Sequence, residues 1–118
     1  MREVRVLVVE DEPMVALDFA AILQDEGYEV IGPARSIDHA LDIIGRQPRL
    51  DHALVDIHLQ GRTVEPVAEA LQRRGVGFAF VTGSGQEAIP ERFRDAPLVQ
   101  KPCRVAELLK ALEHSRRH

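Results

Sequence analysis

The chain has 118 residues, of which 45% are hydrophobic and 29% are charged. This length is typical of a single domain, here residues 1–118, and the composition is that of a globular chain, which excludes a disordered protein. The net charge is −4 and the basic residues are scattered, so the sequence argues against direct binding to nucleic acid.

No apolar stretch approaches the roughly 20 residues that span a bilayer, and the amino-terminal residues do not have the pattern of a signal peptide. We therefore expect a cytoplasmic protein that does not cross a membrane. Cys103 is the only cysteine, which excludes an internal disulfide and a clustered zinc site.

Short apolar runs alternate with amphipathic segments along the whole chain. The runs predict five strands, at residues 4–9, 30–31, 53–55, 78–81 and 98–99. The first helix is predicted to begin after Asp11, with Pro13 in its first turn, and to end near Gly27.

Three further segments have apolar residues at the i, i+3, i+4, i+7 spacing of a helix with one buried face. They predict helices around residues 37–44, 64–71 and 105–112. Ser36 and Thr63 are the predicted N-caps of the first two. Prolines leave only residues 91–95 for a further helix, the fourth along the chain, which we expect to be short or mobile.

Strands that alternate with helices and read as continuous apolar runs indicate a parallel sheet covered on both faces. The sequence thus predicts an α/β fold, a flavodoxin-like doubly wound sheet of five strands in the order 2-1-3-4-5. Ligands bind such sheets beyond the carboxyl ends of the strands, at the switch point between the first and third strands.

Acidic residues follow two of the predicted strands. Glu10 and Asp11 come directly after the first strand, and Asp56 ends the third. Neighbouring parallel strands would bring these three carboxylates together, and carboxylate oxygens are ligands that Mg²⁺ prefers. Taken alone, Glu10 and Asp11 would as readily be helix caps, but the combination with Asp56 and Lys101 favours a divalent-cation site.

Two side chains at the ends of later strands complete a site for phosphoryl transfer. With a metal bound, Asp56 can attack a phosphoryl group and become an acyl phosphate. Lys101, after the fifth strand, would pair with the phosphoryl oxygens, and Thr82, at the end of the fourth, would donate a hydroxyl hydrogen bond.

These positions resemble the receiver domain of bacterial two-component response regulators over essentially the whole chain. The residues that carry the resemblance are Glu10-Asp11, Asp56, Thr82 and Lys101-Pro102. The resemblance implies that Asp56 takes a phosphoryl group, with Mg²⁺, from a sensor histidine kinase or a phosphotransfer protein. Lys101 would contact the phosphoryl group, and Thr82 would be the switch hydroxyl.

The resemblance also implies the remaining roles at the site. Asp11 would be a direct metal ligand, Glu10 would act through water, and the carbonyl of His58 would be the last protein ligand. Gly83 would leave room for the phosphoryl group, and His58 and Ser84 occupy the flanking positions that would tune hydrolysis.

The chain departs from the receiver pattern at a position that would transmit the signal after phosphorylation. Leu98 stands three positions before the lysine, where receivers usually carry an aromatic switch residue. Residues 78–85 resemble a subclass with a Phe-Ala-Thr-Gly motif, whose members often stand alone and pair with histidine kinases of the HWE type. Val81 replaces the alanine before the threonine of that motif.

Other functions remain open from the residues alone. An aspartyl-phosphate phosphatase would need a second acid at position 58, where this chain has His58, so we expect no enzyme beyond self-phosphorylation and self-dephosphorylation. The chain could also be a receiver piece of a hybrid kinase or a longer regulator. The phosphorylated domain would act by changing its contacts with other proteins, or it would serve as a phosphate sink that removes phosphoryl groups from a kinase. The oligomeric state is left open, and the histidines, His52 included, are expected at the surface.

Overall fold

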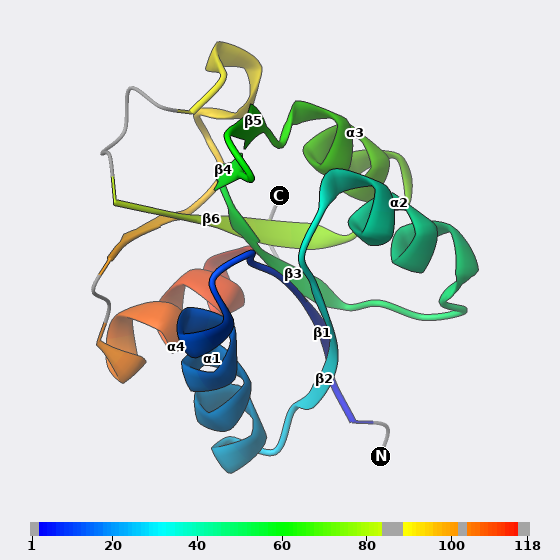
Figure 1. Cartoon of the computed structure of the whole chain (residues 1–118). Coiled ribbons are helices and arrows are strands. Elements are labelled where there is room, and N and C mark those ends of the chain that lie inside the picture. Colours follow the sequence, from blue (N-terminus) through cyan, green and yellow to red (C-terminus); the bar gives the residue numbers. More distant parts are fainter. Residues whose placement is uncertain (1–2, 84–88, 102–103, 116–118) are drawn as a thin grey trace.

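The centre of the protein is one twisted sheet of five parallel strands (Figure 1). The computed structural model describes residues 3–83, 89–101 and 104–115. The strands of this sheet are β1 Arg5–Val9, β2 Glu29–Ala34, β3 His52–Asp56, β6 Gly77–Thr82 and β7 Leu98–Gln100. Their order is β2-β1-β3-β6-β7, which confirms the predicted flavodoxin-like order 2-1-3-4-5.

Helices cover both faces of the sheet (Figure 1). They are α1 Pro13–Asp25, α2 Ile37–Arg46, α3 Glu65–Arg73 and α4 Val105–Ser115. One apolar core joins the sheet to α1 and α4, and the other joins it to α2 and α3. All five residues of β3 are buried, because this central strand has a helical layer on each side. Within the described ranges, no helix has both the length and the apolar character needed to cross a membrane.

The ends of the first two helices follow the local sequence signals. Pro13 is the first residue of α1, where its missing N–H would have had no helical partner. Gly27 follows the helix with a φ of 86°, a left-handed conformation that favours glycine. Ser36 caps α2, since its side chain accepts a hydrogen bond of 3.0 Å from the N–H of His39.

A short antiparallel hairpin between β3 and α3 was not predicted. It pairs β4, His58–Leu59, with β5, Arg62–Thr63. Gln60 and Gly61 form its two-residue turn, with φ values of 53° and 75°. Positive φ at both central residues is what a tight hairpin turn of this kind requires. The prediction that Thr63 caps α3 is therefore wrong, because Thr63 pairs within the hairpin instead.

The predicted fourth helix is a single turn of 3-10 helix, η2, at Glu91–Phe93. Phe93 is buried, and its ring packs edge-on against the rings of Phe78 and Phe80 at centroid distances of 6.0 and 6.3 Å. Arg92 forms ion pairs with two glutamates of α3. This element is thus short, as predicted, and it is fixed to the α3 side of the sheet by one aromatic ring and one cation.

The amino-terminal edge of the sheet is joined to the end of α4 by a buried polar pair. Nδ1 of His52 lies 2.7 Å from Oγ of Ser115, and Ser115 donates to the carbonyl of Leu112. The expectation that His52 is a surface residue is wrong, because α4 covers it and leaves it 4% exposed. Gly77 lies so close to this helix end that a Cβ there would be 2.2 Å from the carbonyl oxygen of Ser115.

Candidate functional site

Three carboxylates meet beyond the carboxyl ends of β1 and β3. Glu10 and Asp11 follow β1, and Asp56 is the last residue of β3. One oxygen from each lies within 4.8 Å of the others. The two strands are adjacent and in parallel register, with Val9 opposite Val55, so the residues that follow them emerge at the same edge. The clustering expected from the strand ends is therefore present.

Glu10 is the most buried member of the cluster, with 0% of its surface exposed. Its backbone N–H donates to the carbonyl of Ala34 at 2.9 Å, and Oε2 accepts from the N–H of Glu12 at 3.1 Å. Burial raises the pKa of Glu10 from 4.5 to about 7, against the opposing hydrogen bond from Lys101. Because burial disfavours the ionised form of Glu10, a positive charge next to its carboxylate would stabilise that form.

Lys101 supplies that positive charge, and it directly follows β7, which is two strands away from β3 in the sheet. Its Nζ lies 2.9 Å from Glu10, 3.1 Å from Asp56 and 3.5 Å from Glu12. Burial alone would lower the pKa of Lys101, but hydrogen bonds to Glu10 and Asp56 outweigh it and raise the pKa. The ammonium therefore stays charged and neutralises part of the acidic cluster.

Thr82 ends β6 beside the cluster and is 1% exposed. Its carbonyl accepts a hydrogen bond of 2.8 Å from the N–H of Lys101, which ties the ends of β6 and β7 together. Gly83 follows it at the surface, and a Cβ on Gly83 would meet nothing within 4 Å. The expected tuning residue Ser84, and Pro102 and Cys103 after the lysine, lie outside the described residues.

The hairpin brings main-chain donors to two of the carboxylates. The N–H of His58 donates to Oδ1 of Asp56 at 3.2 Å, and the N–H of Gln60 donates to Oδ2 of Asp11 at 3.0 Å. The side chain of His58 is exposed, as expected, while the metal-binding role of its carbonyl stays a prediction. Sequence reasoning missed Gln60, and the available signal was Gly61 between two short segments at hairpin spacing.

The cluster fits a hard divalent cation. Its donors are all carboxylate oxygens from closely spaced side chains, and oxygen is the ligand type that Mg²⁺ prefers. Glu10 is buried, while Asp11 is partly exposed, so solvent reaches the cluster at Asp11. Asp11 and Asp56 are the residues that would hold the ion, with Glu10 behind them.

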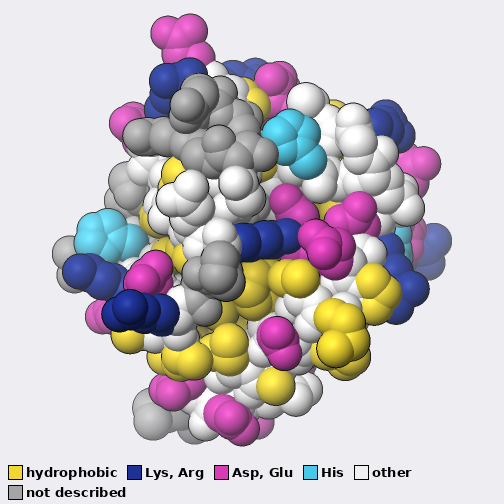
Figure 2. Space-filling view, turned by 60° about the vertical axis from the view of Figure 1, so that its left-hand side comes forward, with side chains coloured by type: hydrophobic (Ala, Val, Ile, Leu, Met, Phe, Trp, Pro, Cys, Tyr) yellow, Lys and Arg dark blue, Asp and Glu magenta, His cyan; other side chains and the backbone are white. Residues whose placement is uncertain are grey.

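The face around the cluster combines acidic and apolar side chains. Figure 2 shows acidic side chains gathered beside basic ones, with hydrophobic side chains spread below them. The large apolar side chains with the greatest exposure in the described ranges are Met14 and Leu17 of α1 and Val105 of α4. A groove of about 530 Å³ runs along α1 and reaches Lys101.

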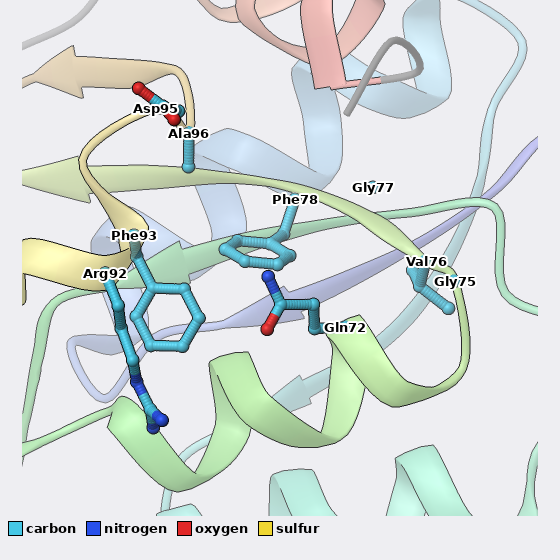
Figure 3. A pocket seen from close by; sticks show the side chains of 9 residues that line it. All are labelled: Gln72, Gly75, Val76, Gly77, Phe78, Arg92, Phe93, Asp95 and Ala96. Atoms are coloured by element: carbon cyan, nitrogen blue, oxygen red, sulfur yellow. The ribbon is translucent and has the colours of Figure 1, made fainter.

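A second hollow, of about 280 Å³, lies away from the acidic cluster at the start of β6 (Figure 3). Phe78 of β6, Phe93 of η2 and Gln72 of α3 point into it, and Arg92 lies at its edge. Its lining holds one carboxylate, Asp95, and no group of three possible metal ligands among the described residues. Among the described residues, the group of possible metal ligands thus lies at the strand ends, away from this hollow.

Comparison with known proteins identifies a family for this chain. Residues 6–113 match the family model described as "Response regulator receiver domain". The chain is 29% identical over 113 residues to the transcriptional regulatory protein PdtaR of Mycobacterium tuberculosis, covering 92% of this chain and 55% of that protein. It is 33% identical over 111 residues to the phyllosphere-induced regulator PhyR of Methylorubrum extorquens, covering 87% of this chain and 40% of that protein.

Among solved structures, the solution structure of SdrG from Sphingomonas melonis superposes with a TM-score of 0.87 at 33% identity and covers 98% of both chains. The chain thus spans about half the length, or less, of the curated relatives, but nearly the whole length of SdrG. Given the matched residues, the sheet order and the carboxylates at the strand ends, this chain belongs to the response regulator receiver domain family.

Proposed function

We propose that this chain accepts a phosphoryl group on Asp56 from the phosphohistidine of a sensor histidine kinase or a phosphotransfer protein. The observation that carries the proposal is the position of Asp56. Asp56 is the last residue of a fully buried strand. Its carboxylate lies 3.1 Å from the ammonium of Lys101 and belongs to the acidic cluster with Glu10 and Asp11.

In the proposed step, a carboxylate oxygen of Asp56 attacks phosphorus, the P–N bond of the phosphohistidine breaks, and the acyl phosphate remains on Asp56. The imidazole leaves and takes up a proton. Lys101 contacts Asp56 at 3.1 Å and would bind the phosphoryl oxygens. Thr82 follows Val81, the residue that pairs with Asp56 across the sheet, and would donate its hydroxyl. Mg²⁺, when bound, would neutralise the carboxylates and the incoming phosphate.

The surface around Asp56 supports a protein as the phosphoryl donor. Met14 and Leu17 are 74% and 65% exposed in the first two turns of α1, which begins two residues after Asp11. Exposed apolar side chains of this size favour a protein contact. A kinase of the HWE type is the donor that the motif resemblance favours. We infer no turnover of other substrates, and the cytoplasmic location stays a prediction.

Beryllofluoride, which mimics a phosphoryl group on aspartate, tests this proposal. With Mg²⁺ present, we expect it to shift the amide resonances of residues next to Asp56, Thr82 and Lys101 in NMR spectra. Mass spectrometry after incubation with a phosphorylated histidine kinase should show one added phosphoryl group per chain. Loss of that group on mild alkaline hydrolysis would identify an acyl phosphate.

Asp56→Asn should show neither the resonance shifts nor the added mass, because the amide is not a nucleophile. Asp38→Asn, at an exposed position of α2, is the matched control and should behave as the wild type. Unchanged spectra in the wild type, or equal phosphorylation of Asp56→Asn, would refute the proposal. Phosphate transfer back to the kinase would distinguish a phosphate sink from a switch read by a separate partner.

A further inference from the structure

The hairpin of β4 and β5 contacts both ends of the proposed metal site through its main chain. The N–H of His58 donates to Asp56 at 3.2 Å, and the N–H of Gln60 donates to Asp11 at 3.0 Å. Asp11 follows β1 and Asp56 ends β3, and the two lie 45 positions apart in the sequence. The hairpin thus contacts both Asp56, the carboxylate that would react, and Asp11, a carboxylate that would bind the ion.

The turn adopts a conformation that its sequence does not favour. Gln60 has a φ of 53°, and it is the one non-glycine residue with positive φ in the described ranges. Its side chain is exposed, so no buried contact of that side chain explains the conformation. An unfavourable backbone conformation that persists beside a reactive group is a reason to look for a functional role. Here the conformation directs the N–H of Gln60 at Asp11.

Leu59 anchors the hairpin to the body of the protein. It is 1% exposed and belongs to the core shared with α2 and α3. Leu59 pairs with Arg62, and His58 pairs with Thr63, so the turn residues have little freedom to move relative to that core. Because the N–H of Gln60 is held in place relative to the core, it restricts the position of the Asp11 carboxylate to which it donates.

We propose that the hairpin is a positioning element for the metal site, in which the N–H of Gln60 fixes the Asp11 carboxylate for binding a divalent cation. This inference rests on the proposed function. One oxygen of Asp11 accepts the N–H, and the carboxylate retains acceptor sites for the ion. Groups that orient metal ligands typically change metal affinity by about 10- to 100-fold when they are lost.

Gly61 offers a clean way to disturb this hydrogen bond. It has a φ of 75° and open space around its Cβ position, so Gly61→Val strains only the backbone of the turn. Gly75 is a matched control, because it has a φ of 70° and equally open surroundings but lies between α3 and β6. Gly61→Ala and Gly75→Ala form a milder pair, which serves if either valine variant fails to fold.

Isothermal titration of the full chain with MgCl₂, without a phosphoryl donor, measures the effect. We expect Gly61→Val to raise the Mg²⁺ dissociation constant about tenfold or more. Gly75→Val should leave it within twofold of the wild type, and Gly61→Asn should restore it, because asparagine tolerates positive φ. Exchange of the Gln60 amide with solvent should also be faster in Asp11→Ala than in the wild type.

Equal Mg²⁺ affinity in the wild type and Gly61→Val would overturn this inference and leave the proposed function standing. Equal weakening in Gly61→Val and Gly75→Val would also overturn it, since the effect would then follow from general destabilisation. A wild-type chain that binds no Mg²⁺ would overturn the proposed function and this inference together.

Discussion

The ammonium of Lys101 lies 2.9 Å from a carboxylate oxygen of Glu10, whose side chain has no exposed surface. The pair joins a residue after β1 to a residue after β7, on opposite sides of the central strands. A buried acid beside a single cation, with a second carboxylate nearby, makes the charge state of this site sensitive to pH and to substitution.

Glu10→Gln should therefore stabilise the metal-free protein at high pH. Burial raises the pKa of Glu10 to about 7, so the folded state binds this proton more tightly than the unfolded state does. Through Glu10, the stability of the wild type falls as the pH rises from 4.5 to 7, whereas glutamine does not titrate. The advantage of Glu10→Gln should grow by on the order of 2 kcal/mol between pH 5 and pH 8.

Urea unfolding at pH 5 and pH 8 in the presence of EDTA measures this difference. Glu113→Gln, at an exposed position of α4, is the control and should show the same stability difference at both pH values. A stability difference for Glu10→Gln that does not change with pH would contradict the prediction.

Lys101→Met should destabilise the metal-free protein by about 2 kcal/mol at pH 8, because removing one partner leaves buried charge without compensation. The loss should shrink at pH 5, where Glu10 is protonated, and added Mg²⁺ should recover part of it. Thermal unfolding with and without Mg²⁺ measures both effects, and Lys110→Met at an exposed site is the control. An equal loss of stability in both lysine variants would contradict this prediction.

Two glycine substitutions should have opposite effects on the free energy of unfolding. A Cβ at Gly77 would be 2.2 Å from the backbone of Ser115, so Gly77→Ala should cost about 2 kcal/mol or more as α4 is displaced. Gly45, inside α2, has nothing within 4 Å of its Cβ position, and Gly45→Ala should stabilise the helix by about 0.5–1 kcal/mol. Urea unfolding measures both, and a stable Gly77→Ala would show that α4 moves freely at this end.

Gln60→Asn should raise the stability by about 0.5–1 kcal/mol, because asparagine adopts positive φ more readily than glutamine. The variant keeps the N–H that contacts Asp11, so its Mg²⁺ affinity should not change. Gln72→Asn in α3 is the control and should be slightly destabilising, since asparagine is the poorer helix former. A lower melting temperature for Gln60→Asn than for the wild type would contradict this prediction.

The parts of the fold that could be predicted from the sequence are those with a clear local signal, such as an apolar run or a proline at the start of a helix. The apolar run before Asp56 and the helix start at Pro13 define where strands end and helices begin, and parallel strand ends must share an edge. The sequence alone could therefore predict that the carboxylates at those ends lie close together.

The hairpin carried only a weak local signal, Gly61 between two short segments, and the buried histidine carried none. The strands of the hairpin are two residues long, too short for a period, and its donors to Asp11 and Asp56 are backbone groups that every residue has. The burial of His52 depends on Ser115, which is 63 residues away. Contacts of this kind follow from how the elements pack against one another, which no local pattern encodes.

The two ends of β3 differ in a way that is useful at the bench. His52 begins the strand under the last turn of α4, and Asp56 ends it at the acidic cluster, roughly 13 Å away at the usual rise per residue. An affinity tag placed after Ser115 would therefore attach the molecule to a sensor chip near the amino-terminal ends of the strands, which lie opposite the carboxylates. Immobilised in that orientation, the protein presents Asp56 to the solution in which candidate kinases are injected.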